Sequence, residues 1–195
     1  MSELQLKWDA IYTANTETPK ASEVLLCNQH LLPTHGNALD LACGLGGNAL
    51  FLAQQGLQLE AWDISGIALA KLGELAQKQN LPITTHQCLI TADLLPKNQF
   101  DVIVISRFLD RSLCNAIMAA LKTEGLLFYQ TFTRNKVDQQ GPSNPVYLLD
   151  CNELLRLFSP LNLIFYQEFG RTGNLQHGNR NEASYIGQKI KPVLT

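Results

Sequence analysis

The chain has 195 residues, of which 46% are hydrophobic and 16% are charged, and its formal net charge is −2. This length predicts one domain with one hydrophobic core, and the composition is that of a globular protein rather than a disordered or fibrous one. The small acidic excess argues against a nucleic-acid partner, because proteins that bind phosphate backbones usually carry a basic excess.

The cysteines and the N-terminal sequence indicate a reduced, aqueous compartment. The five cysteines are scattered and never spaced as CxxC, so we expect neither a disulfide framework nor a metal site. The first residues, MSELQLKWDAIY, carry charges where a signal peptide needs an apolar segment, and no run of about 18 apolar residues follows. We expect a cytoplasmic protein without a membrane partner. No apolar stripe indicates an obligate dimer, so a monomer or a weak homodimer is expected.

Two helical patterns open the chain, and we expect their helices to pack over the rest of the domain. Leu4, Trp8 and Tyr12 recur at spacings of four, and a second pattern, SEVLLCNQHLL, ends before Pro33. Residues 1–32 are therefore assigned to an N-terminal helical cover. We expect Trp8 and Tyr12 to fasten the first helix onto the domain, and a lid over a ligand is the alternative.

Strand-like and helical segments then alternate. Helical patterns cover 48–55, which ends at Gly56, a segment capped by Ser65, and 111–122. The alternation predicts βαβ units and a parallel sheet. Two of the apolar runs, residues 100–106 and 125–132, are too apolar for half-exposed strands, so we expect both at the centre of the sheet. The apolar runs typical of strands are residues 37–42, 57–63, 83–89, 100–106 and 125–132.

The pattern changes after the fifth apolar run. Residues 133–147 form a polar loop, a helix capped by Asp150 follows, and the runs 161–169 and 182–190 are expected to pair as an antiparallel hairpin. The predicted fold class is α/β: a Rossmann-like doubly wound sheet of about seven strands, mostly parallel, with an antiparallel C-terminal hairpin strand.

The stretch LDLACGLGGNALFLAQQG, residues 39–56, places glycines in the turn after the first apolar run. Gly44, Gly46 and Gly47 fall where a Cβ would block the tight bend or the approach of a ligand to backbone N–H groups. In an open parallel sheet, ligands bind beyond the carboxyl ends of the strands. We therefore expect the ligand at this turn, although a glycine-rich turn alone is a weak signal.

Three aspartates at successive strand ends strengthen that expectation. Asp40 ends the first strand, Asp93 follows the third, and Asp63 ends the second, 19 residues beyond Gly44. That spacing is close to the one at which a carboxylate meets the ribose hydroxyls in dinucleotide folds. Carboxylates accept hydrogen bonds from ribose hydroxyls and from an adenine amine, so a ligand that contains adenosine is predicted. Asp40 beside the turn favours a cationic sulfonium or ammonium group over a pyrophosphate.

On these residues, LDLACGLGGNALFLAQQG with AWDIS, the chain resembles the class I S-adenosylmethionine-dependent methyltransferases. Within that superfamily it is similar to the tellurite-resistance and thiopurine-type enzymes. The resemblance implies a single methyltransferase domain over residues 1–195, with a cofactor-binding core at 37–132 and an acceptor side at 133–195. It implies S-adenosylmethionine as the cofactor and in-line methyl transfer to a small-molecule acceptor. One departure is Ala42, where the family usually has glycine, and its methyl group can tighten the pocket or weaken binding.

The resemblance also implies roles for individual residues. Asp63 would accept from both ribose hydroxyls, Asp93 would accept from the adenine amine, and Leu94 or Ile64 would pack on the adenine ring. Asp40 and the backbone of the turn would surround the methionine end. The implied cofactor-binding residues are Asp40, Ala42, Gly44, Gly46, Asp63, Ile64, Asp93, Leu94 and Ser106.

The acceptor is expected beside the loops after the fourth and fifth strands. Their mixture of Arg, Tyr and Asn suits a small anionic or polar molecule. Tellurite or another chalcogen oxyanion, a thiol and a small carboxylate remain open, and no catalytic base is identified. The expected substrate-binding residues are Arg107, Tyr129, Arg134 and Tyr147, and further candidates are Phe108, Thr131, Asn144, Pro145, Arg171, His177 and Arg180.

Two other functions compete with methyl transfer. The segment GLGGNA also fits the G-x-G-x-x-G/A pattern of NAD(P)-dependent oxidoreductases, but Asp40 and the antiparallel C-terminal pair disfavour that interpretation. A non-catalytic protein that binds S-adenosylmethionine is the other alternative. Among single residues, Asp93 can equally be a solvated turn residue, and Cys43 is expected to be a small packing residue.

Overall fold

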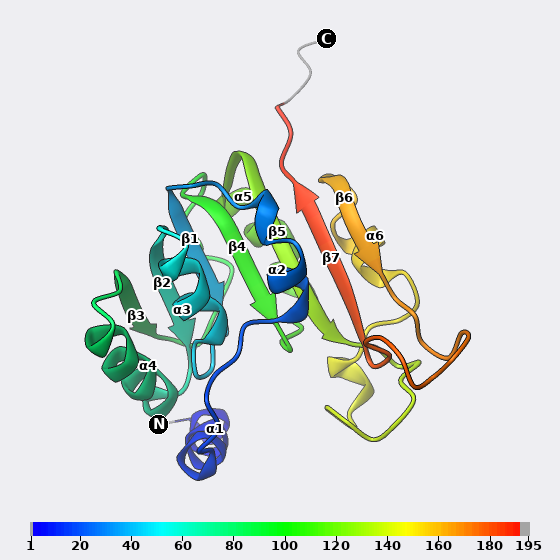
Figure 1. Cartoon of the computed structure of the whole chain (residues 1–195), viewed down its shortest axis with the longest axis horizontal. Coiled ribbons are helices and arrows are strands. Elements are labelled where there is room, and N and C mark those ends of the chain that lie inside the picture. Colours follow the sequence, from blue (N-terminus) through cyan, green and yellow to red (C-terminus); the bar gives the residue numbers. More distant parts are fainter. Residues whose placement is uncertain (1, 192–195) are drawn as a thin grey trace.

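The structure is a computed structural model that describes residues 2–191. A seven-stranded sheet in the order β3-β2-β1-β4-β5-β7-β6 runs through it (Figure 1). Residues 1 and 192–195 of the expected single domain lie outside the described residues. The strands are β1 (Asn37–Leu41), β2 (Gln58–Asp63), β3 (Ile83–Gln87), β4 (Phe100–Ser106), β5 (Leu121–Phe132), β6 (Asn162–Gln167) and β7 (Glu182–Gln188).

The pairing of the strands confirms the predicted fold class. β1 pairs with β2 and β4, β2 with β3, and β4 with β5, all in parallel. β7 runs antiparallel to both β5 and β6. The sheet is therefore mostly parallel and closes with the expected antiparallel pair. Strand order reverses between β1 and β4, which is where ligands bind in sheets of this kind.

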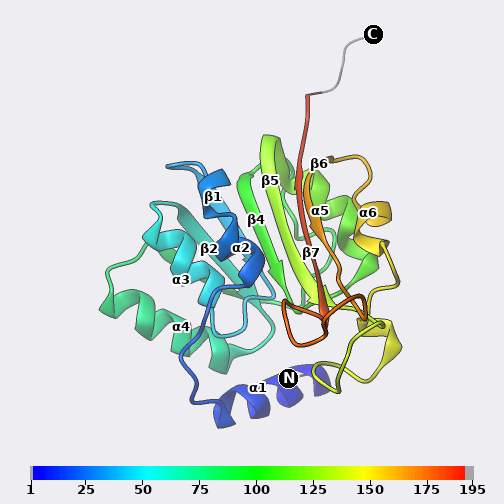
Figure 2. The same ribbon diagram turned by 45° about the vertical axis from the view of Figure 1, so that its right-hand side comes forward.

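Helices cover both faces of the sheet (Figure 2). α2, α3 and α4 pack on one face, and α5 and α6 pack on the other. The α-helices are α1 (Glu3–Ala14), α2 (Glu23–Cys27), α3 (Gly47–Gln54), α4 (Gly66–Lys78), α5 (Cys114–Ala120) and α6 (Glu153–Leu157). Short 3₁₀ turns lie at Gln29–Leu31, Arg111–Leu113 and Pro145–Tyr147.

β4 shows why its sequence is so apolar. Val102 and Val104 are buried in the core under α2 and α3, whereas Ile103 and Ile105 are buried in the core under α5. Successive side chains of a strand point to opposite faces, so a strand covered on both faces needs apolar residues throughout. The expected central positions of β4 and β5 are confirmed by the strand order.

Several element boundaries differ from the expected ones. β5 begins at Leu121 rather than residue 125, because Leu121 already pairs with Phe100 before a register shift. The second N-terminal helix ends at Cys27 and continues only as a 3₁₀ turn. The N-cap of α6 is Asn152, not Asp150. The cap of α4 is as expected, since the Ser65 hydroxyl accepts from the Ala68 N–H.

No helix within residues 2–191 combines the length and the apolar character that crossing a membrane requires.

The start of α3 is closed over by the segment that joins α1 to α2. A Cβ on Gly47 would lie 2.2 Å from the backbone oxygen of Lys20, whereas a Cβ on Gly73 within α4 would have no atom within 4 Å. Gly47→Ala should therefore lower the free energy of unfolding by about 1–3 kcal/mol, the usual cost of overpacking. Gly73→Ala should raise it by about 0.5–1 kcal/mol, because alanine loses less conformational freedom in a helix.

Urea denaturation of both variants checks this pair, with Gly73→Ala as the matched control. If Gly47→Ala were as stable as Gly73→Ala, the close approach of Lys20 to α3 would be wrong.

Candidate functional site

The turn between β1 and α3 is left-handed at three positions. Ala42, Gly44 and Gly46 have φ values of 57°, 53° and 77°. A Cβ on Gly46 would also lie 2.4 Å from a methyl carbon of Leu72. Glycine adopts this conformation freely, but a residue with a Cβ loses about 1–2 kcal/mol in it. Ala42 therefore carries backbone strain, and this is the physical reason to expect glycine at that position.

Asp40 lies beneath the turn and is 1% exposed. Its Oδ2 accepts from the Ala49 N–H at 3.0 Å, near the start of α3, while its Oδ1 has no hydrogen-bond partner. Burial raises the pKa of Asp40 to about 7. A buried carboxylate oxygen without a partner is costly, and Asp40 therefore retains an unused acceptor. It lies at the edge of the sheet where the parallel strands end, which is called the ligand edge below because ligands bind there in sheets of this kind.

Asp63, at the end of β2, joins the turn to the next helix. Its Oδ2 accepts from the Gly44 N–H and its Oδ1 from the Ser65 N–H, both at 2.8 Å. Burial raises its pKa, although these two N–H groups oppose the shift. Each carboxylate oxygen has two lone pairs, so the two backbone bonds leave capacity for ligand hydroxyls. The bracing of Gly44 was not expected from the sequence.

α1 covers the turn at the carboxyl edge of the sheet (Figures 1 and 2). Asp9 accepts from the Ser65 hydroxyl at 2.5 Å, and Lys71 donates to the backbone oxygen of Tyr12 at 2.6 Å. A Cβ on Gly44 would lie 2.6 Å from the Tyr12 hydroxyl. Burial, and then the nearby carboxylates, raise the pKa of Tyr12, so its hydroxyl keeps its proton. The first helix is thus fastened to α4 and also lies over the glycine turn.

The residues expected at the adenine end lie at the rim of the same edge. Ile64 is half-buried after β2, and Asp93 and Leu94 are exposed in the turn that follows β3. A hydrogen bond with the Thr91 side chain lowers the pKa of Asp93. This placement is compatible both with an adenine contact and with the solvated-turn alternative for Asp93.

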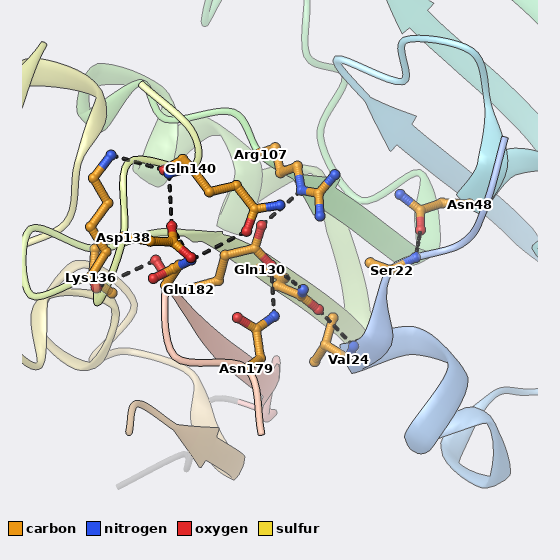
Figure 3. A network of polar contacts seen from close by, with 12 residues as sticks. Ser22, Val24, Asn48, Arg107, Gln130, Lys136, Asp138, Gln140, Asn179 and Glu182 are labelled. Carbon is orange, nitrogen blue, oxygen red and sulfur yellow. Dashed lines mark hydrogen bonds and ion pairs between the residues drawn. The ribbon is translucent and has the colours of Figure 1, made fainter. Parts of the chain in front are cut away.

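Arg107 follows Ser106 directly after β4 and is held by a polar network (Figure 3). Its Nε donates to Glu182 at 2.7 Å, and the Arg107 side chain is 60% exposed while that of Glu182 is 2% exposed. Arg107 has a φ of 55°, the left-handed conformation that a side chain disfavours. Glu182 also accepts from the side chains of Gln130 and Asn179.

An open hollow of about 540 Å³ adjoins this network. The start of α2, the end of β4, the loop after β5 and the loop between β6 and β7 line it. Asn181 ties these loops together, because its side chain accepts from the Val137 N–H at 2.8 Å and donates to Asp138 at 2.9 Å. The hollow is therefore a structured part of the ligand edge.

The structure does not bring every expected substrate residue to this hollow. Tyr129 is 1% exposed, and its hydroxyl donates to the Phe108 backbone oxygen. The expected contact of Tyr129 with the acceptor stays a prediction that the geometry does not favour, because its alternating position on β5 points into the core under α5. Thr131, also on β5, is likewise 1% exposed.

The other expected residues lie on exposed loops. Arg134 pairs with Asp150 at 2.9 Å, and Tyr147 is 49% exposed in a 3₁₀ turn. Arg180 donates from all three of its nitrogens to backbone oxygens of residues 172–177, so it folds its own loop. Arg171 donates to the Lys136 backbone oxygen and links the two loops.

Glu182 and Gln130 are the residues that sequence reasoning missed. Both are buried at the ligand edge, at 4% and 3% exposure. A glutamate at the start of an apolar strand was the available signal, since buried carboxylates are rare without partners. The network also joins Arg107, Gln130 and Val24, which are more than 50 residues from the residues they bind, and this is why the network itself was not predictable.

Comparison with known proteins identifies the family. Residues 5–181 match the family model described as tellurite resistance protein TehB. The chain belongs to the TehB family. Two curated TehB family members from Haemophilus influenzae, each named a probable S-adenosyl-L-methionine-dependent methyltransferase, are similar to it. The protein of strain Rd is 36% identical over 87 residues, which is 43% of this chain and 30% of that protein. The protein of strain 10810 is 32% identical over 124 residues, which is 52% of this chain and 43% of that protein.

Solved structures agree with the fold of the TehB family. The crystal structure of TehB from Haemophilus influenzae has a TM-score of 0.71 at 23% identity, covering 94% of this chain and 67% of that one. Geranyl diphosphate C-methyltransferase from Streptomyces coelicolor, crystallised with S-adenosyl-L-homocysteine, has a TM-score of 0.70 at 12% identity. That match covers 97% of this chain and 98% of the other. These likenesses show a methyltransferase fold.

Asp40 makes the stability of this TehB family member depend on pH. The folded pKa of about 7 lies above the ordinary value of 3.8, so between these values the folded chain holds a proton that the unfolded chain has lost. The stability contributed by Asp40 is present below the lower value and is lost as pH rises through the higher one. From pH 5 to pH 7, Asp40→Asn should gain about 2 kcal/mol of unfolding free energy relative to the wild type, measured by urea denaturation.

Asp101→Asn is the matched control at the opposite edge of the sheet. Although burial opposes them, hydrogen bonds from Lys122 and from the Asn37 N–H hold the pKa of Asp101 below its usual value. Its variant should therefore lose relative stability as pH rises through the ordinary aspartate range. A difference between Asp40→Asn and wild type that does not change with pH would contradict the burial of an Asp40 charge.

Proposed function

We propose that the protein is an S-adenosylmethionine-dependent methyltransferase that acts on a small-molecule acceptor. The observation that carries the proposal is the pair of buried carboxylates, Asp40 and Asp63, on either side of a left-handed glycine turn at the switch point of the sheet. Membership of the TehB family supports it. The curated relatives extend well beyond the matched regions, so the activity of the whole protein belongs to the proposal.

The residues present fit the methyl donor. The unpartnered Oδ1 of Asp40 supplies an acceptor for a cationic amino group, either directly or through a water molecule. The free lone pairs of Asp63 suit the two ribose hydroxyls. At the adenine end, Asp93 would accept from the amine and Leu94 or Ile64 would pack on the ring. Glycine at positions 44 and 46 preserves the turn, because a Cβ there would collide with Tyr12 and with Leu72 respectively.

The protein's own contribution to the reaction is positional. A bound donor supplies a sulfonium methyl group that is already activated. Asp40, Asp63 and the turn fix the donor, and α1 with Tyr12 excludes water from above. Arg107, after β4, lies across the switch point from the turn after β1, where an acceptor can meet the methyl group in line. No residue is assigned as a general base.

The acceptor site is proposed at the hollow beside Arg107. A guanidinium group there favours an acceptor with an anionic oxygen group, such as a chalcogen oxyanion or a small carboxylate. A polar thiol is the remaining class. Tyr147 and Arg134 stand on the exposed loop that follows β5 and would be reached only by a larger acceptor. Nucleic acid is not expected as a partner, and a cytoplasmic monomer or weak homodimer remains the expectation.

The other two functions are separable from this one. An NAD(P)-dependent oxidoreductase would place a pyrophosphate at the turn, next to the buried Asp40, whose carboxylate repels it. A non-catalytic binding protein would use the same donor site without transferring a methyl group.

Titration calorimetry with S-adenosylhomocysteine and NAD in parallel tests the donor site. We expect micromolar binding of the first and none of the second.

Because Asp63 also braces Gly44, the ribose contact is tested by comparing S-adenosylhomocysteine with its 2′,3′-dideoxy analogue. The wild type should bind the analogue more weakly by about 1.5–3 kcal/mol, the scale of hydrogen bonds to a charged group. In Asp63→Asn this preference should shrink.

Asp101→Asn is the control that should keep the full preference for the ribose hydroxyls. Equal preference in Asp63→Asn and wild type would refute the ribose role, even if both ligands bound more weakly. Incubation with methyl-labelled S-adenosylmethionine and a panel of selenite, tellurite, thiols and small carboxylates then separates an enzyme from a binding protein.

A further inference from the structure

We propose that Glu182 is a positioning residue of the acceptor site: it holds Arg107 by its Nε so that the two Nη groups are presented to an anionic oxygen group of the acceptor. The proposal rests on the proposed function, in which the acceptor binds beside Arg107. It assigns a role to a buried carboxylate that neither binds the methyl donor nor lies in the glycine turn.

Three hydrogen-bond donors converge on Glu182. The Arg107 Nε donates to Oε1 at 2.7 Å, the Asn179 Nδ2 donates to Oε2 at 2.9 Å, and the Gln130 Nε2 makes a short hydrogen bond to Oε2. A carboxylate is the one side-chain group that accepts at both ends and donates at neither. Glutamine at this position would have to turn its NH₂ group toward one of the donors. The site is therefore specific for the acid.

Gln130 cannot turn over to relieve such a conflict. Its Oε1 accepts from the Val24 N–H at 2.7 Å, at the start of α2, so its NH₂ must face Glu182 (Figure 3). The network thus has one consistent direction of donors and acceptors. Glu182 is buried at 4% exposure, where an unsatisfied donor is costly.

Arg107 is fixed at its backbone as well as at its Nε. Its N–H donates to the Gln130 backbone oxygen at 2.8 Å, and its guanidinium carbon lies 5.7 Å from the centre of the Phe132 ring. Beyond the Nε, the guanidinium group extends past Glu182 and away from Asp138 (Figure 3). Within residues 2–191, no protein group accepts a hydrogen bond from its Nη atoms.

Arg180 gives the contrast at the same hollow. It also lines the hollow, but its Nε and both Nη atoms donate to backbone oxygens of His177, Thr172 and Asn174. Its hydrogen bonds therefore stabilise the loop. Arg107 keeps two Nη groups for a ligand, in the paired geometry that suits an oxyanion or a carboxylate.

The test is an ¹⁵N–¹H NMR titration of the full chain saturated with S-adenosylhomocysteine. The probes are sodium sulfite for an oxyanion and sodium acetate for a carboxylate, and the reporter is the Nε–H signal of Arg107, assigned by its loss in Arg107→Ala. In the wild type we expect a signal protected from solvent exchange that shifts with at least one probe. The probe that shifts it identifies the anion class.

Glu182→Gln should leave this signal unprotected and raise the dissociation constant of that anion about tenfold, the scale of one charge-assisted hydrogen bond. Its affinity for S-adenosylhomocysteine should stay within about twofold, since the network lies outside the donor site. Arg107→Ala should abolish anion binding, and adding Glu182→Gln to it should change nothing further, because Glu182 acts through Arg107. Asp101→Asn, which breaks an ion pair with Lys122 at the opposite edge, is the matched control.

A folded Glu182→Gln protein that binds the anion as tightly as the wild type would overturn the positioning role. Absence of any anion effect on the wild-type signal would overturn the presentation of Arg107 to an anionic acceptor. Failure of S-adenosylhomocysteine to bind refutes the proposed function instead, and the anion titration without it then decides the role of Glu182 by the same criteria. If Glu182→Gln does not fold, Asn179→Ala replaces it, and an anion affinity unchanged from wild type again overturns the network.

Discussion

The carboxylate of Asp63 holds the ligand edge of this protein together, because its two oxygens accept from backbone N–H groups on different elements. One bond fixes Gly44 in the turn after β1, and the other fixes Ser65 at the start of α4. Ser65 in turn donates its hydroxyl to Asp9 on α1. One side chain thus sets the relative positions of the glycine turn, the second strand and the covering helix. Ribose hydroxyls that bind to Asp63 would therefore meet a carboxylate whose position these hydrogen bonds already fix.

The same arrangement explains why the edge is a place for a ligand rather than a source of stability. Burial raises the pKa of both Asp40 and Asp63, which means that the fold disfavours the charges it encloses. Ala42 adds strain in a left-handed conformation. Strain and buried charge persist only where the surrounding structure over-determines them, and such positions gather at functional sites. A cationic ligand would offset part of this cost by giving the carboxylates a partner.

Sequence patterns were sufficient for the fold and for locating the turn on which the proposed donor site rests. The alternation of apolar runs and helical patterns is local, and the glycine turn with Asp40 and Asp63 lies within 25 residues, so no long-range pairing had to be known. Tyr129 shows the limit. Its type suggested a ligand contact, but on β5 it shares a face with Leu127 in the core under α5, and only the register of the sheet shows which face that is. Glu182 was missed because two of its three partners, Arg107 and Gln130, lie more than 50 residues away in the sequence.

The start of α2 connects the two sides of the proposed site. The Val24 N–H donates to Gln130, which belongs to the network around Glu182, and the Ser22 N–H donates to the Asn48 side chain at 2.8 Å (Figure 3). The Asn48 side chain in turn acts to lower the pKa of Asp40, which burial raises. Two N–H groups at the start of one short helix, those of Val24 and Ser22, therefore reach the acceptor side and the donor side through one side chain each. Since the N–H groups at a helix start have no partners within the helix, α2 satisfies them with the residues that shape the site, and the position of this helix fixes the spacing between the two halves.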